Sequence, residues 1–291
     1  MTKIRNLARR KPYLLVIFIL LVAAVVWAAS ELSGQANQKS VEAAEGSAEM
    51  EMVSLDTVKP PKKEKAPNCD WQKEKELRHE IKAKDEEYKG LIKTAKAEVG
   101  DQGKVSDDTK TKVLDSAKAY SDLQTQYSEM WKSCNCTTRS KLAAKLAASR
   151  LKNAEVVVSE IDDAKLEEMQ KAQDEVREAR REYAEQAKAN DELSAEDKKD
   201  IQVNVVPQTE KMIADFQTLA SSVFSLLQEV QSTATQATSG GASGLFGAAK
   251  KLVGGGGPSL LTQVKMLVTV TKNMVTSAQA LQADAVTLTG N

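Results

Sequence analysis

Apolar residues recur at steps of three and four along most of the chain after residue 68. This is the pattern of helices that bury one face, and it predicts helices over about 70–99, 107–133, 138–190, 207–238 and 258–289. No stretch shows the two-residue alternation of a half-buried strand. Short connections between helices of similar length favour antiparallel pairing. The sequence therefore predicts an all-α fold, an elongated bundle of about five helices with coiled-coil-like antiparallel hairpins.

The predicted bundle divides into two regions that differ in charge. Residues 68–204 are rich in Lys, Arg, Asp and Glu, and they contain three of the helices. The third, 138–190, is the longest, and its stripe changes phase near Asn153 and again near Asp162, where a kink is expected. Residues 205–291 carry only five basic and four acidic residues. We expect them to form one weakly charged hairpin.

Low charge on this final hairpin predicts an assembly surface. Its two apolar stripes are broader than one antiparallel pair can hide, so they need further cover. We expect that cover from the preceding helices and from either a second copy of the chain or another protein. The residues expected at the assembly surface are Leu227, Leu267, Met274 and Leu281.

The N-terminus predicts a membrane anchor. Residues 1–12 contain five Lys or Arg, and residues 13–29 are apolar and uncharged, with Tyr13 and Trp27 near the two ends. Seventeen residues make a helix of about 26 Å, near the lower limit for crossing a bilayer. The alternative is a signal peptide cleaved at the small residues Ala28, Ala29 and Ser30. In both cases the basic flank stays cytoplasmic, and the bulk of the chain is periplasmic or extracellular.

Residues 30–67 connect this segment to the first predicted helix. They show no clear periodicity, carry several glutamates and end in a proline- and lysine-rich run. Chains of this composition bury too little apolar surface to offset their conformational entropy. We therefore predict a disordered tether.

The three cysteines fall at one end of the first predicted hairpin. Cys69 precedes its first helix, whereas Cys134 and Cys136 follow its second. A disulfide from Cys69 to either of them would close a loop of about 65 residues and contribute about 2–4 kcal/mol. It also suits an oxidising compartment. The third cysteine is buried and inert, links two chains, or shares a redox or metal site with its neighbour.

The glycine-rich connection 239–257 contains an apolar island. As a short helix it would separate apolar side chains from two lysines, which is typical of a helix at a membrane interface. A loop that folds back onto the bundle is the alternative. The residues expected to contact a membrane or partner are Leu245, Phe246, Lys250, Lys251, Leu252 and Val253.

Composition narrows the function. Forty-one basic and 41 acidic residues give no net charge, which argues against nucleic-acid binding. The chain has a single histidine, which argues against most catalytic mechanisms and zinc sites that use histidine as base or ligand. We expect no enzyme activity, cofactor, metal or small-molecule substrate. The expected function is that of a membrane-anchored extracytoplasmic scaffold or interaction protein, paired with itself or with an envelope protein. The alternatives are a pore-forming or membrane-bridging protein that uses residues 244–253, and a secreted helical protein.

Overall fold

The computed structural model describes residues 12–58, 66, 68–158, 163–239 and 259–290. Side chains are described from Ser30 in the first helix and up to Thr233 before residue 259, apart from residues 55, 56 and 163. Within these ranges the chain is helical with connecting loops and contains no strand, which confirms the all-α prediction. The elements are α2 (Pro12–Thr57), α3 (Trp71–Gln102), α4 (Asp107–Ser133), α5 (Thr137–Val158), α6 (Asp163–Ala189), α7 (Ala195–Asp200), the π-helical turn η2 (Ile201–Val205), α8 (Val206–Ser239) and α10 (Leu260–Thr289).

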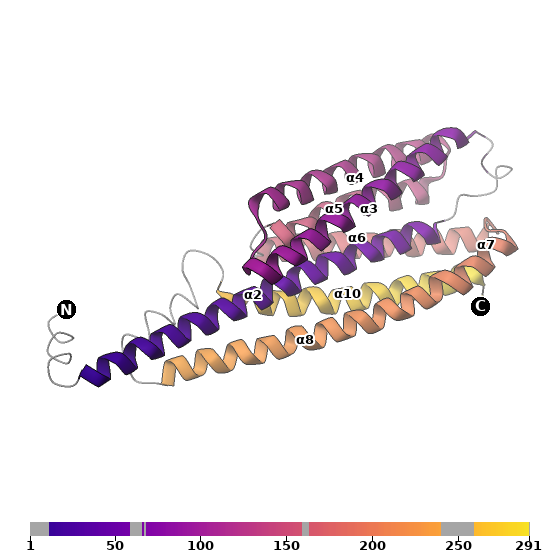
Figure 1. Cartoon of the computed structure of the whole chain (residues 1–291). Coiled ribbons are helices and arrows are strands. Elements are labelled where there is room, and N and C mark those ends of the chain that lie inside the picture. The colour runs from indigo at the N-terminus through magenta and orange to yellow at the C-terminus, as the bar shows by residue number, and fades with distance from the viewer. Residues whose placement is uncertain (1–11, 59–65, 67, 159–162, 240–258, 291) are drawn as a thin grey trace.

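The helices form an elongated bundle with their axes close to its long direction (Figure 1). Helices α3, α4 and α5 pack together on one side, and α8 packs with α10 on the other. Helix α2 contacts α3 and α5 as well as α8 and α10, while α6 lies against α5 and α10. Helices α2 and α6 therefore join the two sides of the bundle, and α2 contacts both helices of the final hairpin.

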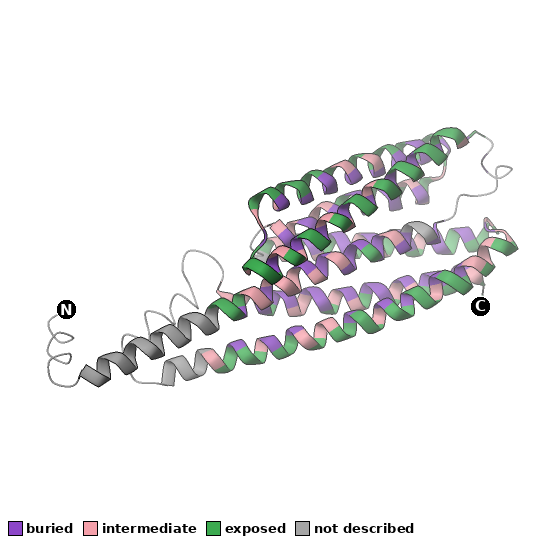
Figure 2. Ribbon diagram, viewed as in Figure 1, coloured by how far each residue is buried: buried purple, intermediate pink, exposed green. Residues whose placement is uncertain are grey.

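This position of α2 corrects the prediction of a disordered tether over 30–67 for residues 30–57, whereas residues 59–65 and 67 lie outside the described residues. The helix runs without interruption from Pro12 to Thr57, and most of its side chains from Leu32 onward are buried or half-buried (Figure 2). One face joins the largest apolar core through Leu32, Ala36, Ala43, Met50 and Val53. Another face packs on α3, α4 and α5 through Val41, Ala44 and Ala48. The stripe was missed because it is built of small residues and because burial on two faces blurs the helical period.

The predicted long helix over 138–190 is also wrong, because the chain reverses and forms two helices. Helices α5 and α6 run antiparallel, as their ion pairs show. Nitrogen–oxygen distances are 2.8 Å for Lys141–Glu182, 2.9 Å for Lys145–Glu175 and 2.6 Å for Lys152–Glu168. The charged region therefore holds four long helices instead of three. The reversal falls between Val158 and Asp163, where no glycine or proline marks a turn.

The final hairpin of α8 and α10 agrees with the prediction, with one difference at its start. The helix does not begin at Pro207, because α7 and η2 lead directly into α8. In η2 the N–H of Val206 donates to the carbonyl of Ile201, five residues back. Proline lacks an N–H and its ring would clash with the carbonyl four residues earlier, so a wider turn before Pro207 keeps the helix continuous.

The close approach of α2 to the final hairpin gives a first prediction. A Cβ at Gly46 would lie 2.8 Å from Met274 Cε and nearer still to the Phe216 ring, whereas a Cβ at Gly90 on α3 would meet nothing within 4 Å. We expect Gly46→Ala to lower the free energy of unfolding by about 1–3 kcal/mol through overpacking. Gly90→Ala should raise it by up to about 1 kcal/mol through helix propensity.

Urea unfolding followed by circular dichroism measures both variants. Equal gains in stability for the two substitutions would mean that residues around Gly46 lie free of the bundle, as a tether would.

Candidate functional site

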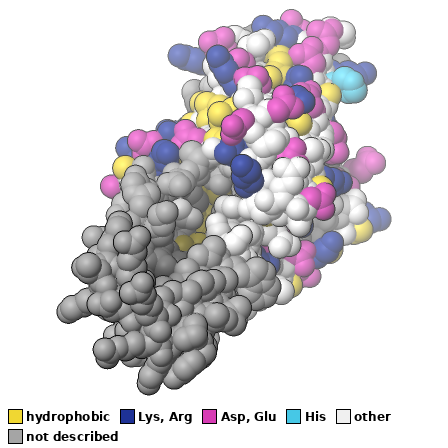
Figure 3. Space-filling model, turned by 60° about the vertical axis from the view of Figure 1, so that its left-hand side comes forward, with side chains coloured by type: hydrophobic (Ala, Val, Ile, Leu, Met, Phe, Trp, Pro, Cys, Tyr) yellow, Lys and Arg dark blue, Asp and Glu magenta, His cyan; other side chains and the backbone are white. Residues whose placement is uncertain are grey.

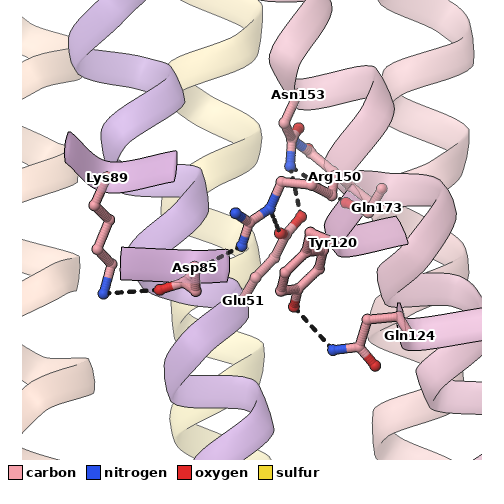
Figure 4. Close-up of polar contacts among 9 residues, drawn as sticks. Glu51, Asp85, Lys89, Tyr120, Gln124, Arg150, Asn153 and Gln173 are labelled. Atoms are coloured by element: carbon pink, nitrogen blue, oxygen red, sulfur yellow. Dashed lines mark hydrogen bonds and ion pairs between the residues drawn. The ribbon is translucent and has the colours of Figure 1, made fainter. Parts of the chain in front are cut away.

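Charged side chains meet in the interior between α2, α3, α4 and α5 (Figure 4). The guanidinium of Arg150 on α5 lies between two aromatic rings, with Cζ 4.6 Å from the Tyr88 centroid and 3.9 Å from the Tyr120 centroid. Its Nη2 donates to Asp85 Oδ1 at 2.6 Å, and its Nε donates to Glu51 Oε2. Asp85 and Arg150 have no exposed surface and Glu51 is 3% exposed, so this buried charge cluster is out of contact with bulk water.

Amide side chains and one lysine extend the buried charge cluster. Asn153 donates to Glu51 Oε1 at 3.0 Å, and Gln173 on α6 donates to Asn153 Oδ1 at 3.4 Å. Lys89 lies 3.1 Å from Asp85 Oδ2 and leads toward the surface, with 22% of its side chain exposed. Gln124 donates to the Tyr120 hydroxyl at 2.9 Å. Ion pairs and hydrogen bonds between buried side chains therefore connect α2 to α3, α5 and α6.

Burial and opposite charges decide the protonation of this cluster. Burial raises the pKa of Glu51, although Arg150 opposes the shift. Burial alone would lower the pKa of Arg150, but the neighbouring Glu51 and Asp85 carboxylates outweigh it and the pKa is raised. The guanidinium thus stays charged at every ordinary pH. Burial also raises the pKa of Tyr88 and of Tyr120, which keeps both hydroxyls neutral.

The space beside the cluster decides what it can do chemically. The adjoining cavity has a volume of about 10 Å³ and is lined by Glu51, Ser54, Ser149, Gln173 and Arg180 among others. That is room for about one water molecule and for no organic substrate. The buried charge cluster therefore holds α2, α3 and α5 together through ion pairs.

A second buried ion pair connects α6 with α10, and its arginine also donates a hydrogen bond to α2. Arg180 on α6 donates through Nε to Asp284 Oδ2 on α10 at 2.6 Å and through Nη1 to Ser54 Oγ on α2 at 3.1 Å. Burial lowers the pKa of Arg180 and raises the pKa of Asp284, and each partner opposes the other's shift. Two separate arginines thus hold α2, one through each half of the bundle.

The disulfide lies at the end of the bundle where α3 begins and α4 ends. Cys69 pairs with Cys134 across a Cα–Cα distance of 4.9 Å, which confirms the predicted bridge and selects one of its two possible partners. Trp71 and Trp131 pack edge to face beside it, with ring centroids 6.2 Å apart. Cys136 is a half-buried free thiol whose pKa is raised by burial.

The residues predicted for an assembly surface lie mostly inside the chain's own core. Leu267 is 1% exposed, and Met274 and Leu281 have no exposed surface. Only Leu227 is half-buried on α8, next to Phe224, which is 49% exposed. The prediction is wrong for the three residues of α10, because α6 and α2 cover this helix within the chain.

Other predictions fall outside the described residues. The tip residues Leu245, Phe246, Lys250, Lys251, Leu252 and Val253 are among them, as are the side chains of the apolar segment 13–29. Among the helices whose side chains are described, none is long and apolar enough to cross a bilayer. Over the same residues, no group of three or more His, Cys, Asp or Glu is placed to hold a metal ion.

The buried charges were not predicted, although the sequence carries a signal for two of them. Asp85 falls in phase with the apolar stripe formed by Leu77, Ile81 and Tyr88 on α3. Arg150 falls at the inward position eight residues after Leu142 on α5. A charge in phase with an apolar stripe indicates a buried, paired side chain, because solvated charges occupy the opposite face.

Comparison with known proteins adds no relative: no family model matches the chain, and no curated protein or solved structure is similar to it. The function of the protein is therefore inferred from the contacts of its described residues and from its sequence.

The buried charge cluster gives a second prediction. Arg150→Met should lower the free energy of unfolding by about 3–5 kcal/mol, because it leaves the Glu51 carboxylate buried without its cation and leaves Asp85 with Lys89 alone. Lys112→Met is the matched control, since it removes a cation from the exposed pair with Asp108 and should cause no measurable change. Denaturant unfolding measures both.

Adding Glu51→Gln and Asp85→Asn to Arg150→Met should recover part of the lost stability, because no uncompensated charge then stays buried. A triple variant that is less stable than Arg150→Met alone would contradict this account.

A third prediction concerns pH. The pKa of Glu51 is raised in the folded chain, so its contribution to stability is complete below pH 4.5 and is lost as pH rises through the folded value. The pKa of Glu98 is lowered by hydrogen bonds from Thr109 and Ser106, so its contribution exists above pH 4.5 and is lost as pH falls. As pH rises, Glu51→Gln should therefore gain stability relative to the unmodified chain, and Glu98→Gln should lose it.

Unfolding free energies at a series of pH values from 3.5 to about 8, spanning the ordinary carboxyl range, test the opposite slopes. Parallel curves for the two variants would disprove the assigned shifts.

Proposed function

We propose that the protein is a non-enzymatic scaffold, anchored in a membrane by residues 13–29, that holds a stiff helical bundle on the extracytoplasmic side. The observation that carries this proposal is the continuity of α2, which runs from Pro12 to Thr57 as one helix. Its N-terminal part extends beyond α3–α6, and its C-terminal part is the central helix of the bundle (Figure 1). Anchor and body would then be one rigid element.

Several contacts fix α2 within the bundle from Asn37 to the C-terminal end of the helix. Asn37 donates to the Gly103 carbonyl at 2.8 Å near one end, and Arg78 donates to the Val58 carbonyl at 2.7 Å near the other. Glu51 and Ser54 meet the two buried arginines between them. Ser30 is seven residues from Asn37, so the first of these contacts would lie only about 10 Å above the apolar segment.

The side of the membrane is supported by charge and by the disulfide. Five basic residues precede the apolar segment, which favours a cytoplasmic N-terminus. The Cys69–Cys134 disulfide would then lie in a compartment where such bonds persist.

The position of α8 along α2 favours membrane contact by the connection between α8 and α10. Gly46 lies against Phe216, and the two helices are antiparallel. Ser239 is 23 residues beyond Phe216, so α8 ends level with about residue 23 of α2. The connection between α8 and α10 therefore leaves and re-enters the bundle on the anchor side. We propose that any membrane contact of this connection is with the anchor's own bilayer.

We also propose a protein partner, either a second copy or another envelope protein. The space-filling view shows charged side chains gathered at the upper end of the described surface (Figure 3). Phe224 and the half-buried Leu227 lie on α8, whose outward positions between Asp215 and Glu229 carry no charge. This face of α8 replaces the buried leucines of the earlier prediction.

A fourth prediction tests the anchor and its orientation. The full chain should stay in carbonate-washed membranes with its N-terminus intact, and a phosphatase that works only outside the cytoplasm should be active when fused after Asn291. An inactive fusion would overturn the proposed orientation. A mature chain that begins near Glu31 would establish the secreted alternative instead.

A matched variant separates a rigid anchor from a flexible one. A dye on Cys136 should tumble with the lipid disc when the full chain is reconstituted in nanodiscs. A five-residue Gly-Ser insertion after Ser30 should speed its anisotropy decay, because it breaks α2 between anchor and bundle. Equal decays in the two proteins would refute rigid coupling.

A further inference from the structure

A polar cavity lies at the disulfide end of the bundle, away from the anchor. It has a volume of about 300 Å³, at the lower end of the range for ligand pockets. Its walls come from the loop before α3, the turn between α4 and α5, and the chain after α6. The lining residues that matter here are Asn68, Asn135, Cys136, Thr138, Arg139 and Glu192.

Arg139 in the first turn of α5 is the unusual member of this lining. Its side chain is 1% exposed, and its guanidinium lies between the rings of Trp131 and Tyr183, with Cζ 5.2 and 4.7 Å from their centroids. Nη2 donates to the Tyr183 hydroxyl at 2.9 Å and to Glu192 at 3.3 Å. Nε and Nη1 are buried and have no hydrogen-bond partner among the described residues.

These unused donors need an acceptor. Leaving an N–H of a buried cation unpaired costs free energy, and the two aromatic rings can compensate only the faces of the guanidinium. An acceptor that reaches Arg139 from the cavity would lower this cost. Among the described residues, the protein itself supplies none to these two nitrogens.

The start of α5 points to the same kind of acceptor. This 22-residue helix begins at Thr137, and its first turn contains no acidic residue. The first N–H groups of a helix lack partners within it, and the helix dipole favours negative charge there. Cys136, Thr138 and Arg139 all line the cavity, so the start of α5 and the residue that carries the unpaired donors border the same space.

Glu192 limits how much negative charge the cavity can accept. It already pairs with Arg139 Nη2, and it accepts a hydrogen bond from Asn190 at 3.3 Å. A doubly charged phosphate would be repelled by this carboxylate, whereas a single carboxylate group needs only the remaining donors. The side-chain amides around the rim offer further hydrogen bonds to a polar ligand.

We propose that this cavity is a binding site for a small carboxylate, held by Arg139 and by the first turn of α5. The proposal stands on the cavity and on Arg139, and it is independent of the scaffold and membrane proposals. A free organic acid and the carboxylate of a partner peptide share this chemistry, and the probes below distinguish them.

Cys136 provides a built-in reporter for the test. It lines the cavity and is the free thiol of the chain, because Cys69 and Cys134 are bonded to each other. Iodoacetate and iodoacetamide alkylate a thiol by the same displacement of iodide, but only iodoacetate carries a carboxylate. The ratio of their rates at Cys136 therefore reports carboxylate binding and cancels differences in thiol accessibility and ionisation.

We expect this rate ratio to be at least about tenfold higher in the folded full chain than in the urea-unfolded chain, which is the gain from one charge-assisted hydrogen bond. The rate should saturate with iodoacetate concentration. Acetate should compete with it at constant ionic strength, and sodium chloride should not. Competition by glycylglycine but not by acetate would assign the site to a peptide terminus.

An equal ratio in folded and unfolded chains would overturn the proposal. So would a raised ratio without saturation or competition, because simple attraction to Arg139 explains that result. Arg139→Lys keeps the charge and should abolish saturation if the guanidinium donors bind the carboxylate. If this variant fails to fold, the comparison of folded and unfolded unmodified chain still decides the question.

Discussion

The charge of Arg150 can stay buried only while Glu51 and Asp85 lie against it and two tyrosine rings cover its faces. These partners come from α2, α3 and α4, so the requirement fixes the rotation and height of three helices relative to α5. Apolar packing alone permits sliding by a turn with modest cost, whereas an ion pair out of register leaves charges without partners. The buried charge cluster thus sets the register of the half of the bundle that contains α3, α4 and α5, and Arg180 does the same toward α10 through Asp284.

Much of the fold could be predicted from the sequence, because several of its helices show a regular apolar stripe. The apolar stripes, with Gly103 after α3 and Ser106 before α4, indicate the bounds of the two helices, and their similar lengths of 32 and 27 residues bring Cys69 to Cys134. The regular stripes of α8 and α10 likewise predict their hairpin. Local pattern suffices here, since each of these helices has one dominant buried face.

The remainder could not be read from local pattern because it depends on partners far along the chain. Residues 30–57 look hydrophilic until α3 and α10 are placed against opposite faces of α2, and their small side chains then allow close approach, as at Gly46. The reversal between α5 and α6 has no glycine or proline to mark it. The carboxylate cavity was invisible for the same reason, since Arg139 resembles any other charge in a solvated helix until Trp131 and Tyr183 enclose it.

The central place of α2 has a consequence for the order of biosynthesis. Helix α2 is made first, yet its contacts with buried arginines come from Arg150, 99 positions after Glu51, and from Arg180, 126 positions after Ser54. During synthesis, the face of α2 that packs on α8 and α10 stays uncovered until most of the protein has been made. Contacts of such long sequence separation form late and slowly. The hairpin of α3 and α4 can close its disulfide well before that, so a nascent chain would pass through a stage with a finished hairpin beside an uncovered, aggregation-prone helix.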